Sequence, residues 1–112
     1  MIDGNLTFED YQDATNTTAI YPGHGTGSQM AVSYLALGLG EAGEVQGKIK
    51  KWLRDSHIDK VEVCAELGDL LWYVARIADE LDISLEHIAR ANISKLADRK
   101  TRGTLQGNGD NR

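Results

Sequence analysis

The chain has 112 residues, which suits one domain with one modest core and leaves no room for two. Twelve Lys and Arg residues stand against 17 Asp and Glu residues, for a formal net charge of −5. Without a basic block, such a chain is not expected to bind nucleic acid through its phosphates. No apolar run approaches the roughly 20 residues of a membrane span, and the first residues do not resemble a signal peptide. We therefore expect a single domain over residues 1–112 that acts in the cytoplasm, away from membranes.

Apolar residues recur at helical spacing along most of the chain. The first such stretch predicts a helix over residues 6–19. Thr7 is its expected N-cap, because a hydroxyl there accepts a hydrogen bond from a free N–H of the first turn. Residues 21–27 contain Pro22 and three glycines, which break helices and favour turns. We therefore expect a loop between the first helix and the rest of the chain.

Three longer stretches follow, each with its apolar residues on one face. They predict helices over residues 28–54, 59–81 and 85–100, with Ser84 as the N-cap of the last. Residues 101–112 hold three glycines and few apolar side chains. We expect a flexible tail there, or a loop that orders only against something else.

A short connection at residues 55–57 joins the two longest predicted helices. Short connections favour antiparallel neighbours, so these helices are expected to form a hairpin. The hairpin and the last helix offer too little core for a stable monomer. We therefore predict an all-α fold, an antiparallel helical bundle of about four helices completed by homo-oligomerisation into a homodimer or homotetramer. Cys64 has no partner for an internal disulfide and is expected to be a small core residue.

Two acidic pairs mark the facing helices of this hairpin. Glu41 and Glu44 lie three residues apart on one helix, and Glu66 and Asp69 lie three apart on the next. Residues at this spacing share a helix face, so the four carboxylates are expected to converge. Such a cluster repels itself unless a cation lies within it. Oxygen ligands without His or Cys favour Mg²⁺, with Mn²⁺ as the other choice.

A Glu-x-x-Glu spacing alone is common on solvated helix faces, but the surrounding glycines favour a site. Glycine in a helix interior costs on the order of 1 kcal/mol relative to alanine, and a solvated face gives no reason to accept that cost. Close approach of another helix or of a ligand does give a reason. The glycines around the first acidic pair are Gly38, Gly40, Gly43 and Gly47.

Cations and aromatic residues lie next to the acidic pairs. Lys48 and Lys51 continue the face of Glu44 by one and two turns, which suits metal-bound phosphate. The alternative is that both lysines only form ion pairs with Glu44 on a solvated face. Trp72 and Tyr73 follow the second acidic pair. Such residues are more often core or interface aromatics, and stacking on a base is the functional alternative.

A polar stripe on the last helix is the third candidate group. Asn92, Lys95 and Arg99 share one face at spacings of three and four, and Arg102 follows in the tail. The two cations suit phosphate, and Asn92 suits phosphate, ribose or base. The alternative for Asn92 is a buried amide that sets helix register. The tail glycines allow close approach to phosphate oxygens, so closure of the tail over a ligand is a further expectation.

In these residues the chain resembles the MazG-like nucleoside triphosphate pyrophosphohydrolases of the all-α superfamily. The family pattern is Glu-x-x-Glu followed, after a gap, by Glu-x-x-Asp, and residues 45–65 form that gap here. The ordered set of matching segments is more specific than either acidic pair. The segments are residues 8–12, 38–45, 66–73, 92–96 and 102–110.

The resemblance implies hydrolysis of a nucleoside or deoxynucleoside triphosphate to its monophosphate and pyrophosphate. It implies that Glu41, Glu44, Glu66 and Asp69 ligate Mg²⁺, and that Glu41 or Glu44 activates the attacking water. It also implies homodimers or larger assemblies with helices paired across subunits. The residues then expected to bind substrate are Lys48, Lys51, Trp72, Tyr73, Asn92, Lys95, Arg99 and Arg102.

Three alternatives stay open at this point. A phosphoribosyl-ATP pyrophosphohydrolase keeps the fold and changes the substrate, although Trp72, Tyr73 and the tail fit the MazG-like pattern better. A di-iron carboxylate bundle needs Glu-x-x-His ligands, and neither acidic pair has a histidine at that position. A non-catalytic helical oligomerisation module would leave the acids as surface residues without metal affinity.

Overall fold

The computed structural model describes residues 4–110 and 112, without the side chains of residues 41–43. Within this part, the chain forms five α-helices and one 3₁₀ turn and has no β-strand, so the predicted all-α fold is confirmed. No described helix combines the length and the apolar character needed to cross a membrane. The elements are α1 (Phe8–Asn16), α2 (Gln29–Gly38), η1 (Leu39–Glu41), α3 (Ala42–Asp55), α4 (Lys60–Glu80) and α5 (Leu85–Arg102).

Helix α1 has the predicted N-cap, Thr7, but begins later and ends earlier than predicted. The Thr7 hydroxyl accepts from the Asp10 N–H, and the Asp10 carboxylate accepts from the Thr7 N–H, which together form a capping box. At the other end, the hydroxyls of Thr15, Thr17 and Thr18 donate to backbone carbonyls three residues earlier. Such hydroxyl bonds compete with the helical pattern, and α1 ends at Asn16.

The prediction of one continuous helix over residues 28–54 is wrong, because the α-helical pattern is interrupted between α2 and α3. The break is the 3₁₀ turn η1, which follows Gly38 directly. A Cβ built on Gly38 would lie 2.2 Å from Cε1 of Tyr73, so only glycine allows this close approach of α2 to α4. The expectation of close packing at the other glycines is wrong for Gly40 and Gly47, since a Cβ on either would meet nothing within 4 Å. Gly38 therefore both allows the close approach and weakens the helix at this point.

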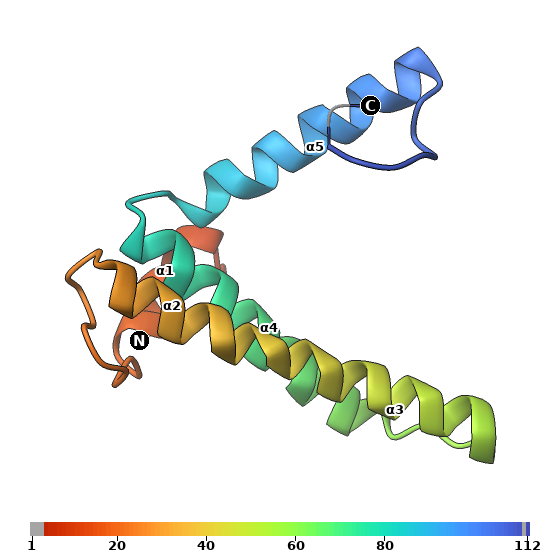
Figure 1. Ribbon diagram of the computed structural model, residues 1–112, viewed down its shortest axis with the longest axis horizontal. Coiled ribbons are helices and arrows are strands. Elements are labelled where there is room, and N and C mark those ends of the chain that lie inside the picture. The colour runs from red at the N-terminus through yellow and green to blue at the C-terminus, as the bar shows by residue number, and fades with distance from the viewer. Residues whose placement is uncertain (1–3, 111) are drawn as a thin grey trace.

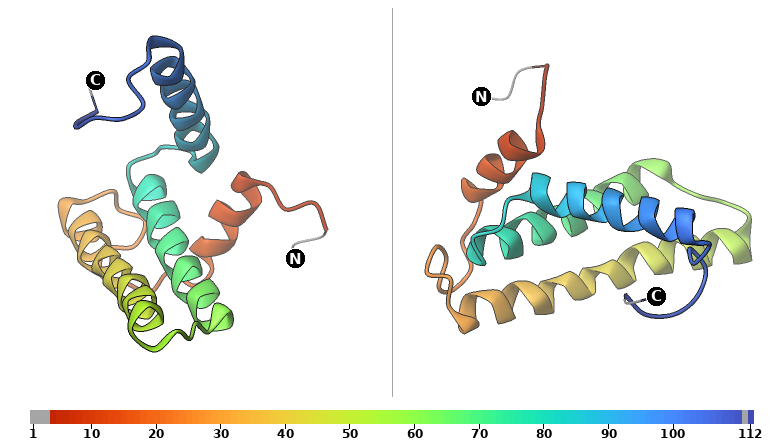
Figure 2. Two further views of the ribbon diagram at one scale, coloured as in Figure 1. Left: turned by 90° about the vertical axis from the view of Figure 1, so that its right-hand side faces the viewer. Right: turned by 90° about the horizontal axis from the view of Figure 1, so that it is seen from above.

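Helix α4 is the central element of the molecule. The α2–α3 arm runs antiparallel along one side of it and α1 crosses another side, while α5 projects away from its C-terminal end (Figures 1 and 2). Gln12 of α1 fixes the turn into α5, because its side chain donates to the Ile83 carbonyl and accepts from the Leu85 N–H, both over 2.9 Å. Ser84 caps α5 as predicted.

The buried apolar core is small and lies around the C-terminal half of α4. Elsewhere, large apolar side chains face solvent: Leu37 is 80%, Leu53 83% and Val61 80% exposed. The expectation that Cys64 is a core residue is wrong, since the described chain leaves it exposed. That further copies of the chain cover these exposed apolar side chains stays a prediction. The core residues are Ala31, Leu35, Ala75, Ala78 and Leu85.

Candidate functional site

The acidic pairs lie on elements that run side by side. Glu44 is on the first turn of α3, and Glu66 and Asp69 are in the N-terminal half of α4. Glu44 and Asp69 are exposed and Glu66 is half-buried. Glu41 is the last residue of η1, and its side chain lies outside the described part of the structure.

Lys48 connects the two helices that carry the acidic pairs. Its ammonium donates to the Glu62 carboxylate over 2.8 Å, which joins α3 to α4. That hydrogen bond and the charges of Glu62, then of Glu66 and Glu44, raise the pKa of Lys48. Lys48 thus pairs with Glu62 of α4. The alternative that Lys48 only pairs with Glu44 on its own helix is wrong. Two candidate ligands, Glu44 and Glu66, are close enough to act on the same ammonium.

Tyr11 of α1 lies within the electrostatic influence of Asp69, and sequence reasoning did not single it out. Burial and, second, the charge of Asp69 raise the pKa of the Tyr11 phenol. Helix α1 therefore borders the site beside Asp69. The only sequence signal was the position of Tyr11 in one of the matching segments, which carries no chemistry by itself.

The described side chains do not form a gathered metal centre. Among them, no group of three or more His, Cys, Asp or Glu lies close enough to hold an ion. The set of candidate donors consists of carboxylate oxygens, the ligands that Mg²⁺ and Mn²⁺ prefer. The chemical type of these donors therefore fits a hard divalent cation. Of the four candidate ligands, only Glu41 has a side chain that the structure does not describe.

The two lysines of α3 lie toward the tip of the hairpin. Lys48 and Lys51 line a cavity of about 220 Å³ together with His57 and three acids of the hairpin tip. Lys51 is exposed, and no described ion pair holds it. Of the two lysines predicted to bind phosphate, Lys51 is therefore the one without a described ion pair.

Trp72 and Tyr73 are held by packing contacts. The Trp72 indole N–H donates to the Thr18 hydroxyl over 2.9 Å, and its ring meets those of Tyr21 and Tyr73 edge-on, at centroid distances of 6.3 and 5.2 Å. Tyr73 in turn packs against Gly38. Both aromatics therefore join α4 to its neighbours, as the core or interface alternative held.

The polar stripe of α5 is not brought to the acids of the same chain. Helix α5 contacts α1 and the adjoining end of α4, and the described residues show no packing of α5 on α3. Asn92 is exposed. Lys95 and Arg99 bind Asp110 of the tail, and Arg102 pairs with Asp98 over 2.8 Å. Asp110 of the tail thus lies against α5 of the same chain.

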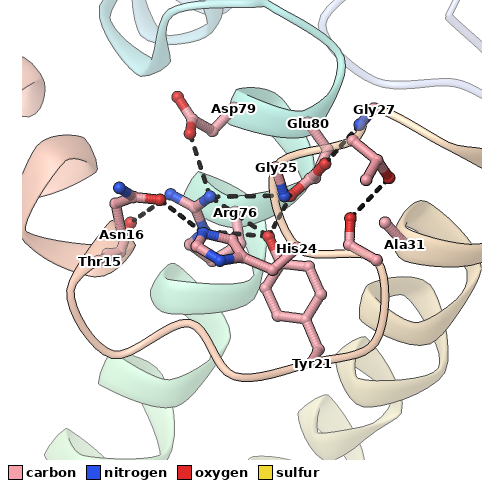
Figure 3. Close-up of polar contacts among 12 residues, drawn as sticks. Thr15, Asn16, Tyr21, His24, Gly25, Gly27, Ala31, Arg76, Asp79 and Glu80 are labelled. Atoms are coloured by element: carbon pink, nitrogen blue, oxygen red, sulfur yellow. Dashed lines mark hydrogen bonds and ion pairs between the residues drawn. The ribbon is translucent and has the colours of Figure 1, made fainter.

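The most completely hydrogen-bonded polar cluster lies at the other end of α4 and was missed by sequence reasoning. Glu80 accepts from the N–H groups of Gly25 and Gly27, each over 2.8 Å, and from the Tyr21 hydroxyl. Arg76, whose side chain is buried, lies 3.0 Å from Asp79 and 3.9 Å from Glu80 and donates to Tyr21 (Figure 3). We call this cluster the loop clamp, because it holds the loop between α1 and α2 on α4.

The electrostatics of the loop clamp favour an ionised Glu80. Burial pushes the pKa of Glu80 upward, but the hydrogen bonds from Tyr21, Gly25 and Gly27 and the charge of Arg76 outweigh burial, so the pKa lies below its ordinary value. Glu80 and Arg76 are four residues apart, a spacing that is usual for exposed helix pairs. The sequence gives no sign that this pair is buried.

Comparison with known proteins places these elements in a family. The model of the MazG nucleotide pyrophosphohydrolase domain matches residues 29–103, from α2 to the end of α5. The chain is also 47% identical over 109 residues to the Gene 37 protein of Mycobacterium phage L5, with 91% of this chain and 96% of the relative covered. No solved structure matches the chain.

Proposed function

Because the chain belongs to the MazG nucleotide pyrophosphohydrolase family, we propose that it hydrolyses a nucleoside or deoxynucleoside triphosphate to the monophosphate and pyrophosphate. The observation that supports this most is the position of the acids. Glu44, Glu66 and Asp69 all lie within the matched residues and on adjacent antiparallel helices. Control of the nucleotide pool in the cytoplasm, or removal of noncanonical nucleotides from it, is the role we propose for that reaction.

Enzymes of this family generally use divalent metals, and we propose Mg²⁺, with Mn²⁺ as a substitute. Glu41, Glu44, Glu66 and Asp69 would hold it with carboxylate oxygens. When bound, such a cation neutralises charge on phosphate oxygens and lowers the pKa of a coordinated water. Glu41 and Glu44 are the proposed catalytic pair, one of which takes the proton of the attacking water.

We assign the phosphates to Lys48 and Lys51, which flank the acids on α3. Trp72 and Tyr73, which packing contacts hold on α4, are the proposed residues for stacking on the base. We propose that Asn92, Lys95, Arg99 and Arg102 come from a second copy of the chain, because α5 of the same chain projects away from α3 (Figure 1). The exposed apolar side chains of α2, α3 and α4 support such a homodimer or homotetramer, since contiguous apolar surface marks an interface.

The decisive experiment measures pyrophosphate release from a panel of NTPs and dNTPs with Mg²⁺. Glu41→Gln and Asp69→Asn should each lower kcat/KM by about 100-fold or more, because each removes a charged oxygen ligand without changing the size of the side chain. Glu86→Gln is the matched control: Glu86 is an exposed acid that pairs with Arg90 on α5, and its loss should leave kcat/KM unchanged. Release of inorganic phosphate, or full activity of Asp69→Asn, would contradict the proposal.

A further inference from the structure

Residues 103–110 and 112, which we call the strap, follow α5, and residues 103–110 fold back along it (Figure 1). Gly103 ends the helix at φ 74°, and the Thr104 N–H donates to the Arg99 carbonyl over 2.8 Å. The guanidinium of Arg112 donates to the carbonyls of Thr104, Leu105 and Gly109 over 2.5 to 3.2 Å. The strap thus has a shape of its own, fixed by bonds between its own residues.

Two kinds of contact join the strap to the cations of α5. The Arg99 guanidinium donates to the main-chain carbonyl of Asp110 over 2.7 Å, and Arg99 is only 3% exposed. The Asp110 carboxylate contacts Lys95 at 3.2 Å and Arg99 at 3.4 Å through the same oxygen, and this side chain is 84% exposed. The main-chain contact is short and comes from a buried guanidinium, whereas the carboxylate contacts are longer and their acceptor is mostly open to solvent.

The carboxylate can therefore leave without release of the strap. Arg112, Thr104 and the main-chain bond to Arg99 keep the strap in place when the Asp110 side chain rotates into solvent. Hydrogen bonds from Lys95 and Arg99, and then their charges, lower the pKa of Asp110. The group that occupies the two cations at neutral pH is thus a carboxylate anion.

We infer that Lys95 and Arg99 form an anion site whose internal ligand is the Asp110 carboxylate, and that a polyphosphate chain displaces this carboxylate on binding. Exposed ion pairs contribute little free energy, and a triphosphate brings several charges where Asp110 brings one. The identity of the polyphosphate as the substrate's triphosphate rests on the proposed function, but the anion site does not. Asp110 thereby sets a threshold for substrate binding.

Calorimetric titration of the full chain with sodium tripolyphosphate tests this inference. A chelator removes any metal that the acids could hold, low ionic strength keeps a weak interaction between charges measurable, and no turnover is needed. Asp110→Asn should lower the Kd by about two- to five-fold, equivalent to about 0.4 to 1 kcal/mol, because the competing charge is gone. Asp110→Glu keeps the charge and should stay close to wild type.

Glu86→Gln is again the matched control, because it also removes one carboxylate from an exposed ion pair on α5. If Asp110→Asn and Glu86→Gln lower the Kd for tripolyphosphate equally, the change in net charge alone explains the effect, and the inference is overturned. Unchanged or weaker binding by Asp110→Asn, or no binding by any variant, would overturn it as well. Tightening in Asp110→Asn with no hydrolysis of nucleotides by the wild type would uphold the anion site and reject the proposed function.

Discussion

The two halves of α4 are built differently. Its C-terminal half carries the core residues Ala75 and Ala78 and the loop clamp, in which nearly every polar atom has a partner. Its N-terminal half carries Glu66 and Asp69 and faces α3, where leucine side chains and carboxylates lie open to solvent. One half therefore holds the chain together, and the other presents the chemistry. Substitutions of the acids can be tested without loss of the fold.

The largest effect is expected from Arg76→Met, in the packed half. The substitution keeps an unbranched apolar stem but removes the guanidinium, which leaves the buried Glu80 without its cation, and breaking a buried pair costs about 3 to 5 kcal/mol. Urea denaturation would measure the loss in free energy of unfolding. Arg90→Met is the control, because Arg90 forms an exposed pair on α5 and should change stability by about 0.5 kcal/mol or less. Equal losses in both variants would remove the contrast between the halves.

A smaller effect is expected from Leu53→Lys, in the open half. In dilute solution its stability should match wild type to within about 0.5 kcal/mol, because Leu53 is exposed in the single chain. Sedimentation velocity should show weaker assembly by about ten-fold or more, since burial of a leucine contributes about 1.5 to 3 kcal/mol. Gln46→Lys adds the same charge to α3 and is the control. Identical assembly of both variants would place Leu53 outside any interface.

The smallest expected effect is the dependence of stability on pH, which tests the contribution of Glu80 to the packed half of α4. The pKa of Glu80 is lower in the folded chain than in the unfolded chain, so its stabilisation is complete above the unfolded pKa and is lost as the pH falls through the folded one. The wild type should lose stability on acidification from about pH 5 to pH 3. Glu80→Gln should be less stable at neutral pH and show a flatter profile. Parallel profiles would assign the acid sensitivity to other carboxylates.

Much of this architecture follows from local sequence signals. The caps Thr7 and Ser84, the glycine-rich loop and the predicted all-α class are confirmed, because each depends on neighbouring residues. The loop clamp and the contact of Tyr73 with Gly38 join residues far apart in the chain, and no local pattern marks them. The four acids were predicted from spacing, and their joint binding of a metal stays a prediction.

The contact between Gly38 and Tyr73 also limits how this chain can vary. The ring occupies the space that any other side chain at position 38 would need. A larger residue there requires a smaller one at position 73, or a shift of α2 that would redirect α3 and Glu44. The two positions are therefore free to change only together. The direction in which the first acidic pair faces thus depends on Gly38 and Tyr73, although neither residue belongs to that pair.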